Sequence, residues 1–225
     1  FDLCVNAASR TSSYCSIQQD SMERLKEILV ERQSKIARAS PQTGCDNVVP
    51  PLFTLDEMTL AKAELKRSGF IVFRDVIDED LQQRFQKAIW DWLRRRSDGR
   101  IYEDVPQTWS NLHWPNSYGP GIQSSHGLCH VPEAWEIRER AAPYFEGLYS
   151  DPDLLVSFDG ANIMRPTTGS GGSAHYFTPR DWLHVDSCGK ISPEYSGYQG
   201  VVNVSGMDGT DGRSGCFQAV PGSHK

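Results

Sequence analysis

His184 and Asp186 are the residues whose type and spacing point most directly to chemistry. They stand two positions apart in residues 182–186, WLHVD, which we expect to form a strand. Alternate side chains of a strand point to the same face, so the imidazole and the carboxylate would lie side by side. Such a pair supplies two of the three protein ligands of a facial triad, which holds Fe(II) and leaves positions open for a co-substrate and oxygen. The competing interpretation is an exposed His-Asp pair at a strand end, because so short a motif also occurs by chance.

Other histidines are candidates for a third ligand or for substrate contact. His224 follows Asp186 by 38 positions, and its alternative role is structural, as a cap or as a partner of the backbone. His175 follows a Gly/Ser loop and either lines a cleft or is a solvated side chain. A further group lies in an irregular, Trp-rich segment that either contacts substrate or is a surface loop held by aromatic packing: His113, His126 and His130.

Three amides stand among apolar neighbours on expected strands: Asn162, Gln199 and Asn203. An amide buried without a partner is costly, so each should either bond the backbone inside the core or face a bound co-substrate. Arg165 precedes Pro166 at a strand end, where an arginine is usually solvated, although it could attract a carboxylate. Trp182, Tyr195 and Tyr198 are candidates for the apolar wall of a pocket or for the core.

The elements that must position these residues change character along the chain. Residues 1–19 are polar and unpatterned and are interpreted as an arm or loop. Capping signals and apolar residues at helical spacing then predict helices over residues 20–39, 54–67, 78–96 and 132–148. The third helix should bury the stripe Leu81, Phe85, Ile89 and Trp92. Residues 100–131 show no sustained period, which is typical of a lid or binding loop.

Short strands are predicted mainly in the second half of the chain. They cover residues 70–73, 154–158, 161–164, 182–185, 198–204 and 216–220. Helices followed by short strands indicate an α+β fold, with helices packed on a β core.

Four stretches together resemble the phytanoyl-CoA dioxygenase-like family of Fe(II)/2-oxoglutarate oxygenases. They are residues 65–73 (LKRSGFIVF), 153–166 (DLLVSFDGANIMRP), 183–186 (LHVD) and 215–225 (GCFQAVPGSHK). The resemblance implies a double-stranded β-helix, or jelly-roll, with N-terminal helices packed on one sheet. It also implies a domain division into an N-terminal arm and helix (residues 1–53) and an oxygenase domain (residues 54–225).

The same resemblance implies a site and an activity. His184 and Asp186 would bind Fe(II), 2-oxoglutarate would be the co-substrate, and a small organic or acyl molecule would be hydroxylated with O₂. The family's distal histidine and the arginine that binds 2-oxoglutarate would follow Lys225, so we expect the 225 residues to be a fragment. Missing chain or a protein partner would then cover the open strand edges. The alternative function is a non-catalytic member of this fold that acts as a structural or interaction module.

Composition excludes several other classes. The chain has 38% hydrophobic and 23% charged residues, as ordinary globular domains do, and no apolar run long enough to cross a membrane. The net charge of −6 and the short Arg94–Arg96 cluster do not favour nucleic acid. Its six cysteines form no CxxC pair, and no secretory signal is evident, so reduced thiols and an intracellular location are expected.

Overall fold

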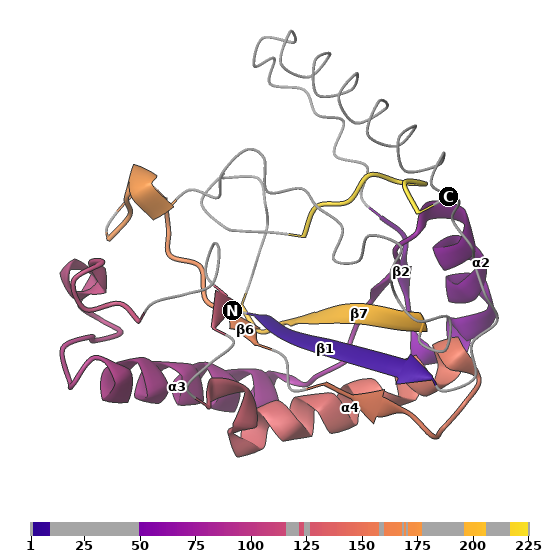
Figure 1. The fold of residues 1–225 in the computed structure, drawn as a ribbon, viewed down its shortest axis with the longest axis horizontal. Helices are drawn as coiled ribbons and strands as arrows, with labels where there is room; N and C mark the ends of the chain where they lie inside the picture. Colours follow the sequence, from indigo (N-terminus) through magenta and orange to yellow (C-terminus); the bar gives the residue numbers. More distant parts are fainter. Residues whose placement is uncertain are drawn as a thin grey trace, which may run out of the picture. The chain divides into compact units, whose positions relative to one another are not determined.

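The computed structural model describes residues 2–9, 50–115, 122–123, 127–157, 160–167, 169, 171–176, 196–205 and 217–224 (Figure 1). These residues belong to two compact units. The first unit contains the described residues within 1–9, 75–185 and 197–218. The second contains those within 10–74, 186–196 and 219–225.

Two long helices form the frame of the first unit, α3 (Glu79–Arg96) and α4 (Pro132–Tyr149). The carboxylate of Asp78 caps α3 by accepting the backbone N–H of Leu81 at 2.8 Å. Pro132 occupies the first position of α4, where a missing N–H is tolerated. Three short 3₁₀ turns accompany these helices: η2 (Pro106–Trp109), η3 (Leu128–His130) and η4 (Ala174–Tyr176).

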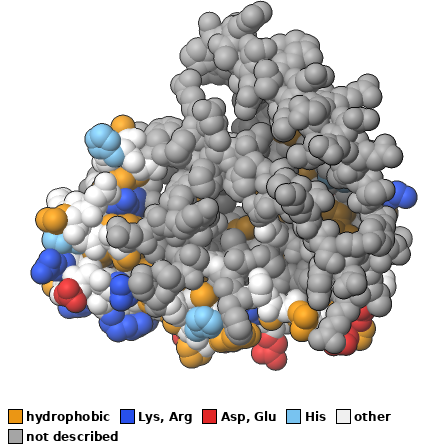
Figure 2. Space-filling model, viewed as in Figure 1, with side chains coloured by type: hydrophobic (Ala, Val, Ile, Leu, Met, Phe, Trp, Pro, Cys, Tyr) orange, Lys and Arg blue, Asp and Glu red, His pale blue; other side chains and the backbone are white. Residues whose placement is uncertain are grey.

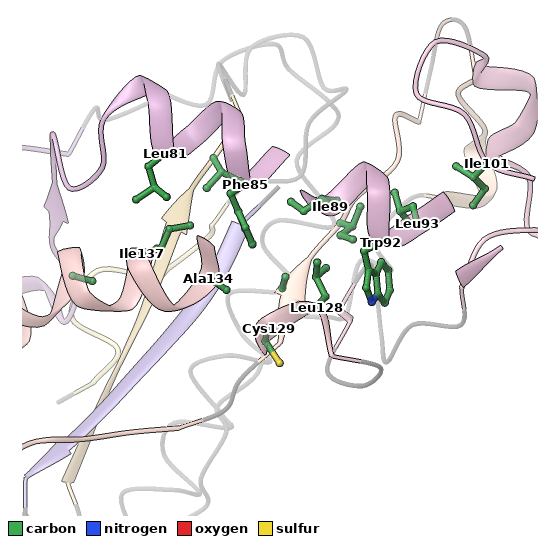
Figure 3. Packing of buried hydrophobic residues seen from close by; sticks show 14 of the residues in the cluster. Leu81, Phe85, Ile89, Trp92, Leu93, Ile101, Leu128, Cys129, Ala134 and Ile137 are labelled. Atoms are coloured by element: carbon green, nitrogen blue, oxygen red, sulfur yellow. The ribbon is translucent and has the colours of Figure 1, made fainter. Parts of the chain in front are cut away.

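The hydrophobic core of this unit lies along one face of α3. Leu81, Phe85 and Ile89 of α3 are completely buried, and they pack with Ile137 of α4 in one cluster (Figure 3). Ala161, Ile163 and Val204 extend this cluster to the strand region. The helical period of the sequence thus gives a single buried stripe, as predicted.

The C-terminal end of α3 carries positive charge. Arg94, Arg95 and Arg96 are exposed in its last turn. Figure 2 shows Lys and Arg side chains gathered at the left of this face of the molecule. Cations at this position stabilise a helix, because its last carbonyl groups carry partial negative charge.

Strand β1 (Asp2–Ser9) is the central member of a five-stranded sheet. β1 pairs antiparallel with β5 (Leu155–Val156) and with β6 (Ala161–Asn162), and it also pairs with β7 (Ser196–Asn203). Figure 1 shows β1 and β7 side by side. β4 (Ile122–Gln123) pairs antiparallel with β6. β1 also contacts α4, so one helix of the frame adjoins the sheet.

The register along β1 shifts by one residue between its two short partners. Ala7 lies opposite Val156, whereas Leu3 lies opposite Ala161. The order of the sheet is β4-β6-β1-β5, and β7 pairs with β1 off this path.

The second unit contains a parallel pair of strands joined by a helix. β2 (Leu52–Phe53) pairs with β3 (Val72–Phe73), and the 3₁₀ turn η1 (Leu55–Glu57) and α2 (Met58–Ser68) connect them. Thr54 and Glu57 form the predicted capping box, in which the Glu57 carboxylate accepts the Thr54 N–H at 2.9 Å. Gly69 ends α2 in the left-handed conformation, with φ of 88°.

Most of the described helices and strands agree with the sequence predictions. The helices over 54–67, 78–96 and 132–148 and the strands in 70–73, 154–158, 161–164 and 198–204 are confirmed, although several of these strands are only two residues long. The predicted helix over residues 20–39 and the strand over 182–185 lie outside the described residues. The described part of the chain is a mixed helix and strand structure, and the jelly-roll stays a prediction.

Two predictions were wrong. The segment interpreted as an arm contains β1, because backbone groups distant in sequence supply the hydrogen bonds that a short local pattern does not reveal. The strand over 216–220 is absent from its described residues, 217–220. That segment instead leads into the turn at Pro221–His224, where the Gly222 N–H donates to the Ser68 carbonyl at 2.7 Å.

Among the helices that the structure describes, none is long and apolar enough to cross a lipid bilayer.

Candidate functional site

The two predicted iron ligands, His184 and Asp186, lie outside the described residues. His126 and the expected pocket residues Trp182 and Tyr195 lie outside them as well. Within the described ranges, no three His, Cys, Asp or Glu side chains are grouped closely enough to hold a metal ion.

The three predicted co-substrate amides lie on two strands. Asn162, on β6, is partly buried, and its backbone lies opposite both Asp2 of β1 and Ile122 of β4. Gln199 and Asn203 are both exposed on β7, four positions apart, so they share one face of that strand. β6 and β7 both pair with β1, so the three amides lie on strands that share this neighbour.

β7 is anchored to the end of α4 through two tyrosines. The backbone N–H of Tyr198 donates to the Tyr149 hydroxyl at 2.7 Å, and the two ring centroids are 4.8 Å apart. Burial raises the pKa of Tyr149, and the hydrogen bond from Tyr198 opposes that rise. The beginning of β7, the strand that carries Gln199 and Asn203, is therefore attached to α4 of the helical frame.

Arg165, three positions after Asn162, lies in a cluster that sequence reasoning missed. Its Nη1 donates to the Trp109 carbonyl and its Nη2 to Asn111 Oδ1, both at 2.7 Å. The guanidinium carbon also lies 3.6 Å from the ring centroid of Tyr176 and 4.8 Å from that of Trp114. We call these five residues the Arg165 cluster.

Burial lowers the pKa of Arg165, with a small opposing effect of Tyr176. An arginine remains charged in spite of such a shift, because its guanidinium does not lose its proton in proteins. No carboxylate pairs with it among the residues that the structure describes. Neutral oxygens and aromatic faces therefore stabilise this partly buried cation.

Trp109 connects the cluster to the helical frame. Its ring centroid is 5.4 Å from that of Trp90 on α3, and its Nε1 donates to the Tyr102 carbonyl at 2.8 Å. Its own carbonyl accepts a second hydrogen bond, from the Tyr176 hydroxyl at 3.2 Å. Gly171 also approaches Trp109 closely, since a Cβ at that position would lie 3.1 Å from Trp109 Cε3. The irregular segment is thus fixed to two other parts of the unit, α3 and the residues from Arg165 to Tyr176.

The described histidines form no common ligand cluster within the described ranges, and each has its own surroundings. His113 is partly buried, and its Nδ1 has no hydrogen-bond partner among the described residues. His130 and His175 are exposed. His224 is also exposed, and its Nε2 lies 3.2 Å from the Lys66 carbonyl near the end of α2, which agrees with its alternative structural role.

A shallow groove also occurs on the first unit, between α4 and residues 152–156. Trp135 and Phe145 of α4 line it together with Leu155 and Val156 of β5. Its walls also carry Glu136, Glu139, Arg140 and Glu146, so its lining is mixed apolar and charged. Its lining residues include none of the predicted site residues.

The aromatic residues of the irregular segment 100–131 are the sequence signal that could have indicated the Arg165 cluster. Tyr102, Trp109 and Trp114 fall within 13 residues, and aromatic rings commonly take a cationic partner. The partner itself was not identifiable, because Arg165 lies 56 positions after Trp109.

No protein-family model, no curated protein and no solved structure matches this chain. The function of the protein must therefore be inferred from its own residues.

Proposed function

We propose that this chain is a non-haem Fe(II)/2-oxoglutarate-dependent dioxygenase with a jelly-roll core, which hydroxylates a small organic or acyl substrate. The observation that carries the proposal is the His184-Val185-Asp186 motif, in order with three other stretches that resemble the phytanoyl-CoA dioxygenase-like family. Imidazole nitrogen and carboxylate oxygen are the donor types of the facial triad, so this donor set fits Fe(II).

A contact in the second unit supports the proposal. Gly69, from the stretch 65–73, and His224, from the stretch 215–225, lie against each other. These are two of the four stretches on which the resemblance depends, and they are more than 150 residues apart in the sequence. Stretches that belong to one fold motif are expected to meet in this way.

Each residue has a definite role in the proposal. His184 and Asp186 would hold the iron, which when bound supplies the activation of O₂ coupled to the oxidation of 2-oxoglutarate. The side-chain N–H groups of Asn162, Gln199 and Asn203 would donate hydrogen bonds to the carboxylate or keto oxygens of 2-oxoglutarate. Exposure of Gln199 and Asn203 leaves their amides accessible to such a ligand in the described part of the chain.

Anaerobic Fe(II) titration with 2-oxoglutarate present, followed by measurement of succinate release in air, tests the proposal. His184→Ala and Asp186→Ala should each abolish iron binding and succinate release, because each removes a protein ligand. His130→Ala, which removes an exposed histidine outside the metal motif, is the matched control for iron binding. Unchanged iron binding in His184→Ala would refute the ligand assignment. A full-length wild-type protein that binds neither iron nor 2-oxoglutarate would favour the non-catalytic module.

A further inference from the structure

Arg165 begins the irregular segment 165–176 and also contacts a second irregular segment that is distant in sequence. On one side are Trp109, Asn111 and Trp114, which belong to the segment 106–114 that begins with η2. On the other is Tyr176, at the end of the segment 165–176. Arg165 is therefore a common partner of both.

The contacts use the shape of the guanidinium group as well as its charge. Both terminal nitrogens donate to oxygens of the segment 106–114, at 2.7 Å each, while two aromatic rings lie within 4.8 Å of the central carbon. A planar group with two forked donors can make hydrogen bonds and ring contacts at the same time, whereas a lysine ammonium is a compact point charge.

Other contacts, which do not involve Arg165, also join the segments 106–114 and 165–176. The Tyr176 hydroxyl donates to the same Trp109 carbonyl that Arg165 binds. A Cβ at Gly171 would lie 2.5 Å from Pro106 Cβ, so the backbone of one segment already touches the other. The Ser173 N–H donates to the Pro166 carbonyl at 3.2 Å, which joins the two described parts of this segment.

We propose that Arg165 is a clasp that fastens the segment 106–114 to the segment 165–176, and that release of this clasp frees 106–114 to move as a strap. The only helical element of the segment is the short turn η2, and it has few backbone hydrogen bonds of its own beyond single turns. Segments of this kind open at low free-energy cost unless side-chain contacts hold them. The clasp belongs to the fold and does not depend on whether the chain binds iron.

The clasp differs from the other arginine contacts between distant segments of this unit. Arg84 of α3 forms a two-pronged ion pair with Glu136 of α4, at 2.9 and 3.0 Å, and it also pairs with Asp80. Those charges are partly exposed and are screened by salt. Arg165 instead binds neutral groups, so the strap should stay fastened at high ionic strength.

Hydrogen exchange of the backbone amides, measured on the full chain, tests the clasp. Arg165→Lys keeps the charge but loses the forked donors, so amides of residues 106–114 should exchange at least about 10-fold faster than in the wild type. Arg100→Lys, at an exposed arginine of the same region, is the matched control and should leave these rates unchanged. Exchange in 1 M NaCl should remain slow in the wild-type segment.

Two outcomes would overturn the proposal. The first is wild-type protection of residues 106–114 in Arg165→Lys, which would mean that charge alone suffices or that other contacts hold the segment. The second outcome concerns the case in which Arg165→Lys also loses protection in α3, which would mean that this variant has unfolded and that another variant must be tested. Asn111→Ala, which removes the Oδ1 acceptor of Arg165, then decides: faster exchange confined to 106–114 supports the clasp, and unchanged exchange refutes it.

Discussion

The imidazole of His224 lies against Gly69, so closely that a Cβ at Gly69 would come within 2.8 Å of His224 Cγ. Gly69 ends α2, and the same ring lies 3.2 Å, through Nε2, from the Lys66 carbonyl in the last turn of that helix. The missing side chain at Gly69 thus makes room for the histidine that covers the helix end. Two requirements meet at this glycine, a left-handed backbone and a close neighbour.

Gly69→Ala should therefore be more damaging than an alanine at another glycine with a similar backbone. A left-handed alanine costs about 1–2 kcal/mol, and displacement of the His224 ring adds to that cost. Gly222→Ala is the control, because Gly222 has φ of 79° but an alanine Cβ placed there would have no atom within 4 Å beyond its two neighbours in the chain. Urea denaturation of both variants measures the difference, and equal losses would show that the ring contact contributes nothing.

Leu81→Ala should lower the free energy of unfolding by about 2–5 kcal/mol, because Leu81 is completely buried against the core of the first unit. Leu112→Ala removes the same atoms from a side chain that is 82% exposed, and its effect should stay within about 0.5 kcal/mol. Denaturant midpoints compare the two. A large loss in Leu112→Ala would indicate that this side chain is covered in solution.

Asp78→Ala should destabilise α3 by about 1 kcal/mol, because it removes the acceptor for the Leu81 N–H at the helix start. Asp78→Asn keeps an oxygen in the same position and should recover most of this stability. Thermal unfolding followed by circular dichroism gives the comparison. If the asparagine variant were as unstable as the alanine variant, charge rather than the capping bond would be responsible.

Tyr149 makes stability depend on pH in the alkaline range. Its pKa is raised by burial, so above pH 10 the unfolded chain ionises this phenol while the folded chain keeps it neutral. The contribution is complete below about pH 10 and is lost as pH rises through the folded pKa. Tyr149→Phe should therefore reduce the decline of unfolding free energy above pH 10, by at most about 1.4 kcal/mol per pH unit.

Urea midpoints at pH 8 and at several values above pH 10 provide the measurement. Tyr102→Phe, at an exposed tyrosine, controls for the general effect of removing a phenol. An identical alkaline decline in the wild type and in Tyr149→Phe would contradict the assignment.

The parts of the structure that the sequence predicted are those with local causes. The stripe of α3 and the capping box at Thr54 depend on residues within a few turns of each other, so period and spacing suffice. β1 was missed because its hydrogen-bonding partners lie far along the chain. The Arg165 cluster was missed for the same reason, since no local pattern shows which aromatic residues will surround a single arginine.

The predicted site also contains features that local sequence indicates and features that depend on distant parts of the chain. His184 and Asp186 were predicted as ligands from their spacing together with the family resemblance, and their positions lie outside the described residues. The exposure of Gln199 and Asn203 depends on which face of β7 the rest of the unit covers, and a strand's own sequence only weakly determines that choice when polar and apolar residues are mixed.

The position of β1 in the sheet has a consequence for the order in which the protein forms during synthesis. Ala7 leaves the ribosome 149 residues before its partner Val156, a difference of 156 − 7. At about 5–20 residues per second, this strand waits for roughly 7–30 s without the backbone groups it will pair with. The contact between α3 and α4 spans only 52 residues at Arg84 and Glu136, so it closes sooner. Nascent chains should therefore acquire their helical frame first, while β1, although it emerges before both helices, pairs after them.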